Sequence, residues 1–110
     1  MVVEDDEDIR RSLTELLEDE GYSVLVAQDG ARALEVLEKG ARPCLMLVDL
    51  LMPVMDGVEL IQRLRGSQEL AKIPVVVVSA ASAIAPPEGM RILRKPVGCE
   101  DVLREVERYC

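Results

Sequence analysis

Five polar residues fall at or just after the ends of apolar segments, and their types suit phosphoryl chemistry. Glu4 and Asp5 follow the opening valines, Asp49 interrupts the apolar run "CLMLVDL", Ser79 ends "IPVVVVS", and Lys95 follows "RILR". Carboxylates held close together raise each other's pKa and need a counter-charge. An all-oxygen cluster favours magnesium, which takes one or two carboxylates together with phosphate oxygens. The pattern therefore predicts a magnesium-dependent phosphoryl site.

The expected roles differ between the members of this set. Asp49 is the candidate nucleophile, because a carboxylate can form an acyl phosphate. Magnesium, the Lys95 ammonium and the Ser79 hydroxyl would stabilise the charged oxygens during in-line transfer. Taken singly, Ser79 and Lys95 also read as an ordinary strand-end hydroxyl and a solvated lysine. Asp49 resists such a reading, since a lone acid in a buried strand needs a partner.

The elements that would position these residues alternate between strands and helices. Apolar spacing predicts helices that start near Ile9, after a cap at Asp29 and after a cap at Asp56. Gly21 and Gly40 are expected to end the first two. The other expected elements are strands over the opening valines, 22–28, 44–50, 73–80 and 91–95, and a last helix over 100–109.

Strands that alternate with helices imply parallel pairing through right-handed crossovers, with helices on both faces of the sheet. We therefore predict an α/β fold, a doubly wound five-stranded parallel sheet. In such a sheet, ligand sites lie beyond the carboxyl ends of the strands. All five polar residues should meet at that edge. Glu4 and Asp5 could instead cap the first helix and favour its dipole, although we expect Glu7 and Asp8 to do so.

Length and composition bound the class of protein. The chain has 110 residues, which suits a single domain. A net charge of −8 argues against nucleic acid or an anionic membrane as a direct partner. No apolar run reaches the roughly 18 residues of a membrane span, and no signal peptide is recognisable. We expect a cytoplasmic protein.

Three cysteines stand at positions 44, 99 and 110, without a CxxC pair, and the chain has no histidine. Zinc ligation is therefore disfavoured. The prediction for these cysteines is reduced thiols, in the core or at the surface of a cytosolic protein.

With these residues assembled, the chain resembles the receiver domains of two-component response regulators along nearly its whole length. The motifs "VVEDDEDIR", "LVDLLMPVMDG", "PVVVVSA" and "RKP" occur in the order of that family. The resemblance implies a flavodoxin-like fold with strand order 2-1-3-4-5. It also implies a sensor histidine kinase or a phosphotransfer domain as the phosphoryl donor. The whole chain, 1–110, would be one receiver domain, and whether it stands alone or is a module of a larger protein stays open, as does a homodimer.

The same resemblance assigns a role to each site residue. It implies a phosphoprotein that is not an enzyme beyond its own phosphorylation and dephosphorylation. The implied roles are Asp49 as phosphoacceptor, Glu4, Asp5, Asp49 and the Leu51 backbone carbonyl as magnesium ligands, Ser79 as switch hydroxyl and Lys95 as phosphate-pairing lysine.

Two departures from the family pattern concern the route from the site to a partner. Only fifteen residues separate Ser79 from Lys95, and they include "APPEG". Consecutive prolines break helices, so the fourth helix of the family is expected to be short or missing. The switch aromatic three residues before the lysine is replaced by Ile92.

Two alternatives from other classes stand beside this interpretation. A phosphohydrolase of the haloacid-dehalogenase type would need a second carboxylate two residues after the nucleophile, where Leu51 stands. A receiver-like interaction scaffold that signals without phosphate would fit the two departures. The complete five-residue site disfavours it.

Overall fold

The computed structural model describes residues 1–49, 55, 57–79, 91–94 and 98–110. Its centre is a five-stranded parallel sheet in the order β2-β1-β3-β4-β5, which confirms the predicted order. The strands are β1 (Val2–Val3), β2 (Val26–Ala27), β3 (Met46–Asp49), β4 (Val75–Ser79) and β5 (Arg91–Arg94).

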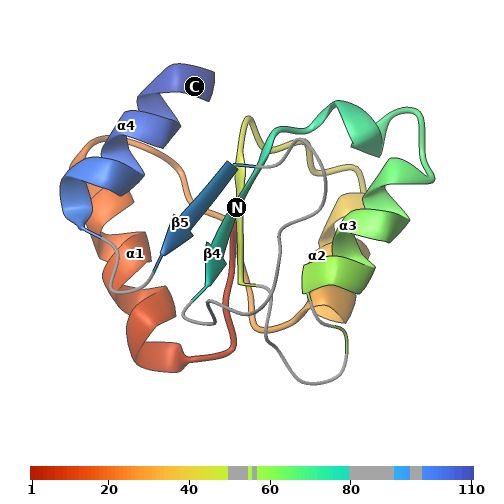
Figure 1. The fold of residues 1–110 in the computed structure, drawn as a ribbon, viewed down its shortest axis with the longest axis horizontal. Helices are drawn as coiled ribbons and strands as arrows, with labels where there is room; N and C mark the ends of the chain where they lie inside the picture. Colours follow the sequence, from red (N-terminus) through yellow and green to blue (C-terminus); the bar gives the residue numbers. More distant parts are fainter. Residues whose placement is uncertain (50–54, 56, 80–90, 95–97) are drawn as a thin grey trace.

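Helices cover both faces of this sheet. Within the described ranges they are α1 (Glu7–Asp19), α2 (Gly30–Glu38), α3 (Gly57–Arg65), the short 3-10 helix η1 (Leu70–Lys72) and α4 (Cys99–Tyr109). Figure 1 shows α1 and α4 on one face, and α2 and α3 on the other. In the part of the chain that the structure describes, no helix is long and apolar enough to span a bilayer.

In β1, β3 and β4, alternate residues pack on opposite faces of the sheet, as the two-residue period of a strand requires. Met46 and Val48 of β3 pack toward α2 and α3, against Leu37 and Leu60. Leu47 packs on the other face with residues of α1 and α4; the buried members there are Val2, Leu17, Leu45, Leu47, Val76, Val78, Val102 and Val106. Because both faces of β3 are buried, its continuous apolar sequence is explained.

Local signals set the ends of the first two helices. Asp29 caps α2 as predicted, and its side chain accepts a 2.8 Å hydrogen bond from the Arg32 amide. The cap of α1 is Asp6, whose side chain accepts from the Ile9 amide at 3.1 Å. The prediction that Glu7 and Asp8 cap this helix is wrong, because both lie inside its first turn. The chain leaves both helices through glycines with positive φ, Gly21 at 92° and Gly40 at 108°. Glycine takes this conformation without the steric cost that other residues meet.

The second strand is shorter than predicted. Of the segment 22–28, only Val26 and Ala27 join the ladder with β1. Leu25 and Val26 are exposed, at 41% and 46%. The segment has strand-like composition, but it lies at the sheet edge, where composition alone does not fix how many residues pair.

An acidic side chain, Glu105, is buried on the inner face of α4 and was not foreseen. It is 2% exposed, and its Oε1 accepts hydrogen bonds from Arg91 Nε at 2.9 Å and Arg91 Nη2 at 2.6 Å. The hydrogen bonds that Arg91 donates to Glu105 raise the pKa of the Arg91 guanidinium above its ordinary value. Arg91 lies at the start of β5, so this ion pair joins the edge strand to the last helix.

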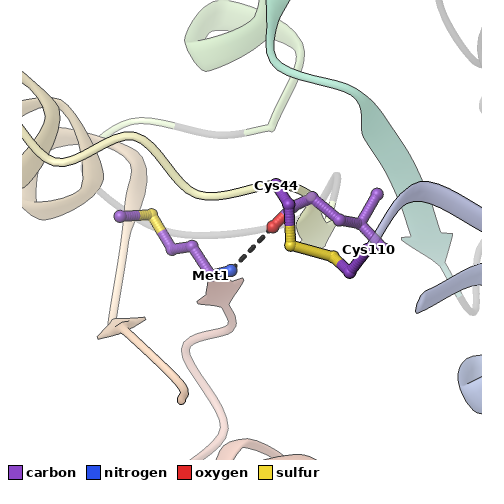
Figure 2. The surroundings of a disulfide bond; sticks show 4 residues. Met1, Cys44 and Cys110 are labelled. Carbon is purple, nitrogen blue, oxygen red and sulfur yellow. Dashed lines mark hydrogen bonds between the residues drawn. A yellow bond between two sulfur atoms is a disulfide. The ribbon is translucent and has the colours of Figure 1, made fainter. Parts of the chain in front are cut away.

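The prediction of reduced thiols is wrong for two of the three cysteines. Cys44 and Cys110 form a disulfide with a Cα–Cα distance of 5.6 Å (Figure 2). The residues are 66 positions apart, and they meet because α4 packs across the sheet until its end lies beside the start of β3. Cys99, at the other end of α4, is free and exposed.

Two further predictions concern residues 80–90 and Asp56, which lie outside the described residues. The short or missing fourth helix and the Asp56 cap therefore stay predictions. The helix that follows Asp56 is present as α3.

Candidate functional site

Three carboxylates meet at the carboxyl edge of the sheet. Glu4 and Asp5 follow β1, and Asp49 is the last residue of β3. One carboxylate oxygen from each residue lies within 4.8 Å of the others. Glu4 and Asp49 are buried, at 2% and 6% exposure, whereas Asp5 is exposed. The cluster therefore has two acids below the surface and one at its mouth.

The pairing of β1 with β3 produces this convergence. Val3 is in register with Val48, so the residues that follow each of them leave the sheet at the same level. The Glu4 amide donates to the Ala27 carbonyl at 3.1 Å, which extends the ladder toward β2. Arg10 of α1 then donates to the Glu4 carbonyl at 2.9 Å, and this contact ties the start of the first helix to the site.

The donor set fits a divalent cation that prefers oxygen. Burying two carboxylates beside a third is unfavourable unless a positive charge is added. Within the cluster, the Asp5 amide donates to Glu4 Oε2 at 3.2 Å. Magnesium needs few protein ligands and keeps several waters. Two buried acids and one exposed acid match that demand.

Ser79 lies on the neighbouring strand, close to the level of Asp49. Asp49 is in register with Val78 of β4, so Ser79 is one residue further toward the same edge. The Ser79 side chain is fully buried. Ser79 is also in register with Arg94, the residue that precedes Lys95 in the chain. Lys95 and Leu51 lie outside the described residues, so their predicted roles stay predictions.

The segment after Asp49 contacts the start of α2, a relationship that the sequence reasoning did not identify. The Gly30 amide donates to the Met55 carbonyl at 3.1 Å. A Cβ at position 30 would lie 2.8 Å from that oxygen and 2.9 Å from Met55 Cγ. Glycine is thus required for this approach. The only sequence signal was a glycine directly after the Asp29 cap.

Ile92, which replaces the expected aromatic residue, lies in β5. It is half-buried and packs against Ile61 and Val77. The position is therefore part of the apolar packing between β4, β5 and α3.

Comparison with known proteins gives a consistent result. The family model for the response regulator receiver domain matches residues 1–107. Response regulator receiver protein CpdR of Brucella abortus (strain 2308) is 37% identical over 112 residues, covering 98% of this chain and 92% of that protein. Sensor histidine kinase TmoS of Ectopseudomonas mendocina is 39% identical over 103 residues, which cover 94% of this chain and 10% of the kinase.

Solved structures agree with this result. The chemotaxis protein CheY4 of Vibrio cholerae matches with a TM-score of 0.85 and 30% identity, over 99% of this chain and 95% of that one. The receiver domain of the hybrid histidine kinase CckA matches with a TM-score of 0.83 and 32% identity, over 98% of this chain and 94% of that one.

Proposed function

The chain belongs to the response regulator receiver domain family of two-component signalling, and on that premise we propose that it is a switch in which Asp49 accepts a phosphoryl group. The donor is a sensor histidine kinase or a phosphotransfer domain. The observation that carries the proposal is the cluster of Glu4, Asp5 and Asp49, whose carboxylate oxygens lie within 4.8 Å of one another.

In the proposed transfer, a carboxylate oxygen of Asp49 attacks the phosphorus of a phosphohistidine. The new P–O bond forms as the P–N bond breaks, and the imidazole leaves with the electron pair. Burial of Asp49 supports this role, because a mostly desolvated carboxylate is held in one position for in-line attack. Nucleophilic transfer to a carboxylate is established chemistry for aspartate.

Glu4 and Asp5 would hold magnesium together with Asp49 and the Leu51 carbonyl. When bound, magnesium offsets the negative charge of the carboxylates and of the incoming phosphoryl oxygens. Glu4 is fixed by its backbone contacts to β2 and α1. Asp5 is exposed and lies where a hydrated ion can enter. The chain thus supplies a preformed set of three acids, of which Glu4 and Asp49 are buried and Asp5 is exposed.

Ser79 and Lys95 would read the phosphorylated state. A hydroxyl and an ammonium can each donate to phosphoryl oxygens, both during transfer and once the group is on Asp49. The register of Asp49 with Val78, next to Ser79, supports this assignment. Cytoplasmic location and a single receiver unit over the whole chain are parts of the same proposal.

Intact mass after incubation with magnesium and acetyl phosphate tests the proposal. Acetyl phosphate replaces the unidentified kinase as a small-molecule donor. We expect the wild-type protein to gain the mass of one phosphoryl group. Asp49→Asn keeps the shape of the side chain and should gain nothing.

Asp6→Asn is the matched control for this experiment. Asp6 is an exposed acid that lies next to the cluster in the chain and caps α1. Asparagine caps a helix as well as aspartate does. This variant should be phosphorylated like the wild type. Absence of an adduct in the wild type, with magnesium shown to bind, would favour the interaction scaffold instead.

A further inference from the structure

We propose that Cys44 and Cys110 are a reversible redox pair, oxidised by small-molecule disulfides of the glutathione class, and that their bond latches the last turn of α4 to the start of β3. The proposal concerns the amino-terminal edge of the sheet, opposite the acidic cluster, and does not depend on the proposed phosphorylation.

The fold itself brings the two cysteines together. Cys44 precedes Leu45, which is 4% exposed, and Cys110 follows Val106, which is 5% exposed. Both anchors belong to the same buried core between the sheet and the helices α1 and α4. Since this core is built from side chains rather than from the bond, it keeps Leu45 and Val106 packed in the reduced protein as well, so the Cys110 thiol, four residues after Val106, stays within reach of Cys44. Oxidation and reduction can therefore occur within the folded state.

The bond lies where small molecules can reach it. Cys44 and Cys110 are both exposed residues. Exposed disulfides are the labile and regulatory ones, whereas buried structural bonds resist reduction. In the cytosol, which the sequence predicts for this chain, the disulfides that form are mostly transient or redox-sensing. The exposure of the bond and the predicted cytosolic location thus both favour a labile, regulatory disulfide.

The last turn of α4 depends on the bond for its position. Residues 107–110 are all exposed, so no side chain beyond Val106 is buried in the core. Beyond the end of α4 at Tyr109, the Cys110 amide donates to the Val106 carbonyl at 2.8 Å. Below the bond is a cavity of about 40 Å³ lined partly by Tyr22 and Leu45, so packing there is incomplete. Reduction should leave this turn to fray, as helix ends without buried contacts do.

The chemistry balances as two consecutive exchange steps. The thiolate of one cysteine attacks a sulfur of the oxidised reagent, forms a mixed disulfide and releases one reagent thiol. The second protein thiolate then attacks the protein sulfur of that mixed disulfide and releases the second reagent thiol. Two electrons pass from the protein to the reagent, and the two protons end on the two released thiols.

The latch and the acidic cluster lie at opposite ends of β3. Cys44 precedes the strand and Asp49 ends it, which separates them by roughly 16 Å at the rise of a strand. Redox state should therefore leave phosphorylation at Asp49 unchanged. The experiments below can therefore show that the redox proposal is wrong whether or not Asp49 is phosphorylated, and the phosphorylation test is likewise independent of the redox state.

A glutathione titration of the full chain with Cys99→Ser tests the pair. This background removes the free thiol and keeps the pair intact. The protein is equilibrated at increasing ratios of reduced to oxidised glutathione, then alkylated and weighed intact. We expect one reversible transition between a form with no alkylated cysteine and a form with two, reached from both directions. A bond that persists at the highest ratio of reduced glutathione, or never forms in oxidised glutathione alone, overturns the proposal.

Hydrogen exchange on the same samples tests the latch. We expect loss of amide protection in residues 107–110 on reduction, with protection of β3 retained. Cys44→Ser in the Cys99→Ser background should exchange like the reduced protein in every buffer. If exchange at the end of α4 is the same in both redox states, the latch is refuted even where the pair titrates.

Discussion

The Gly30 amide, at the start of α2, donates a 3.1 Å hydrogen bond to the Met55 carbonyl, and the two backbones lie too close for a side chain at position 30. Met55 belongs to the segment that links Asp49 to α3. The start of α2 therefore fixes one point of the chain that leaves β3.

Gly30→Ala should destabilise the protein by about 1–3 kcal/mol, the usual cost of overpacking. The added Cβ would meet a backbone oxygen at 2.8 Å, which cannot yield by a rotamer change. Urea unfolding followed by circular dichroism measures the change. Gly66→Ala is the control, because the nearest atom there is 3.4 Å away. The free energy of unfolding of Gly66→Ala should equal that of the wild type or exceed it by up to about 1 kcal/mol. A Gly30→Ala protein as stable as the control would contradict the close approach.

Magnesium should raise the melting temperature, because an ion that binds only the folded state stabilises it, by about 2.7 kcal/mol at a hundred times its Kd. The stability of Asp5→Asn relative to the wild type should depend on whether metal is present. Without metal the variant should be more stable than the wild type, since one of three clustered negative charges is gone. On addition of magnesium, the melting temperature of Asp5→Asn should rise by less than that of the wild type. Melting curves in EDTA and in magnesium check both signs, with Asp6→Asn as the control. Equal gains in Asp5→Asn and wild type would remove Asp5 from the metal site.

The sequence predicted the helix positions and the acidic convergence because each has a local signal, whereas the strand order came from the family resemblance. Asp49 interrupts an apolar strand, and Glu4 follows one, so parallel pairing alone brings them together. The Cys44–Cys110 bond has no such signal, since three cysteines allow three pairs and only the packing of α4 selects one.

Glu105 escaped prediction for a related reason. Its position along α4 faces inward, but its charge suggested a solvated side chain. The partner that makes burial tolerable, Arg91, comes from a different element, 14 residues earlier in the chain. The length of β2 was overestimated because strand-like residues such as Leu25 continue beyond the paired segment.

The ion pair between Arg91 and Glu105 should show strong coupling. Arg91→Met removes both hydrogen bonds to a buried carboxylate, whose Oε2 already has no hydrogen-bond partner among the described residues. The single variant should be less stable than the wild type, because a buried charge is left uncompensated. Adding Glu105→Gln should recover part of the loss. A double-mutant cycle by urea unfolding measures the coupling. Additive losses would show that the pair is not formed in solution.

Loss of the Cys44–Cys110 bond should cost about 4 kcal/mol, from the chain-entropy relation for a loop of this length. Oxidised protein should therefore unfold at clearly higher urea concentration than Cys44→Ser or Cys110→Ser. Cys99→Ser should unfold like the oxidised wild type, because Cys99 is free and exposed. A difference below about 1 kcal/mol would mean that the reduced chain is already constrained when unfolded.

A protein that starts at Met1 should lose stability between pH 8 and pH 6. Burial lowers the pKa of the Met1 amino group from 8.0 to about 6, although the group donates to the Leu45 carbonyl at 2.7 Å (Figure 2). In this range the unfolded state binds a proton that the folded state does not, so stability rises with pH. The full effect is about 2–3 kcal/mol.

Unfolding free energies across that range check the sign. The chain has no histidine, so few other groups titrate there. Acetylation of the Met1 amine should flatten the curve. A slope that survives acetylation would assign the effect to another group.

The disulfide also changes how the chain responds to force. Tension applied at residue 110 of the oxidised protein passes through the sulfur–sulfur bond to Cys44, so residues 45–109 between them carry no load. In the reduced protein the same tension would peel α4 from the sheet first. The redox state of one exposed bond therefore decides whether a pull from the carboxyl end is resisted by a surface helix or by the central strand.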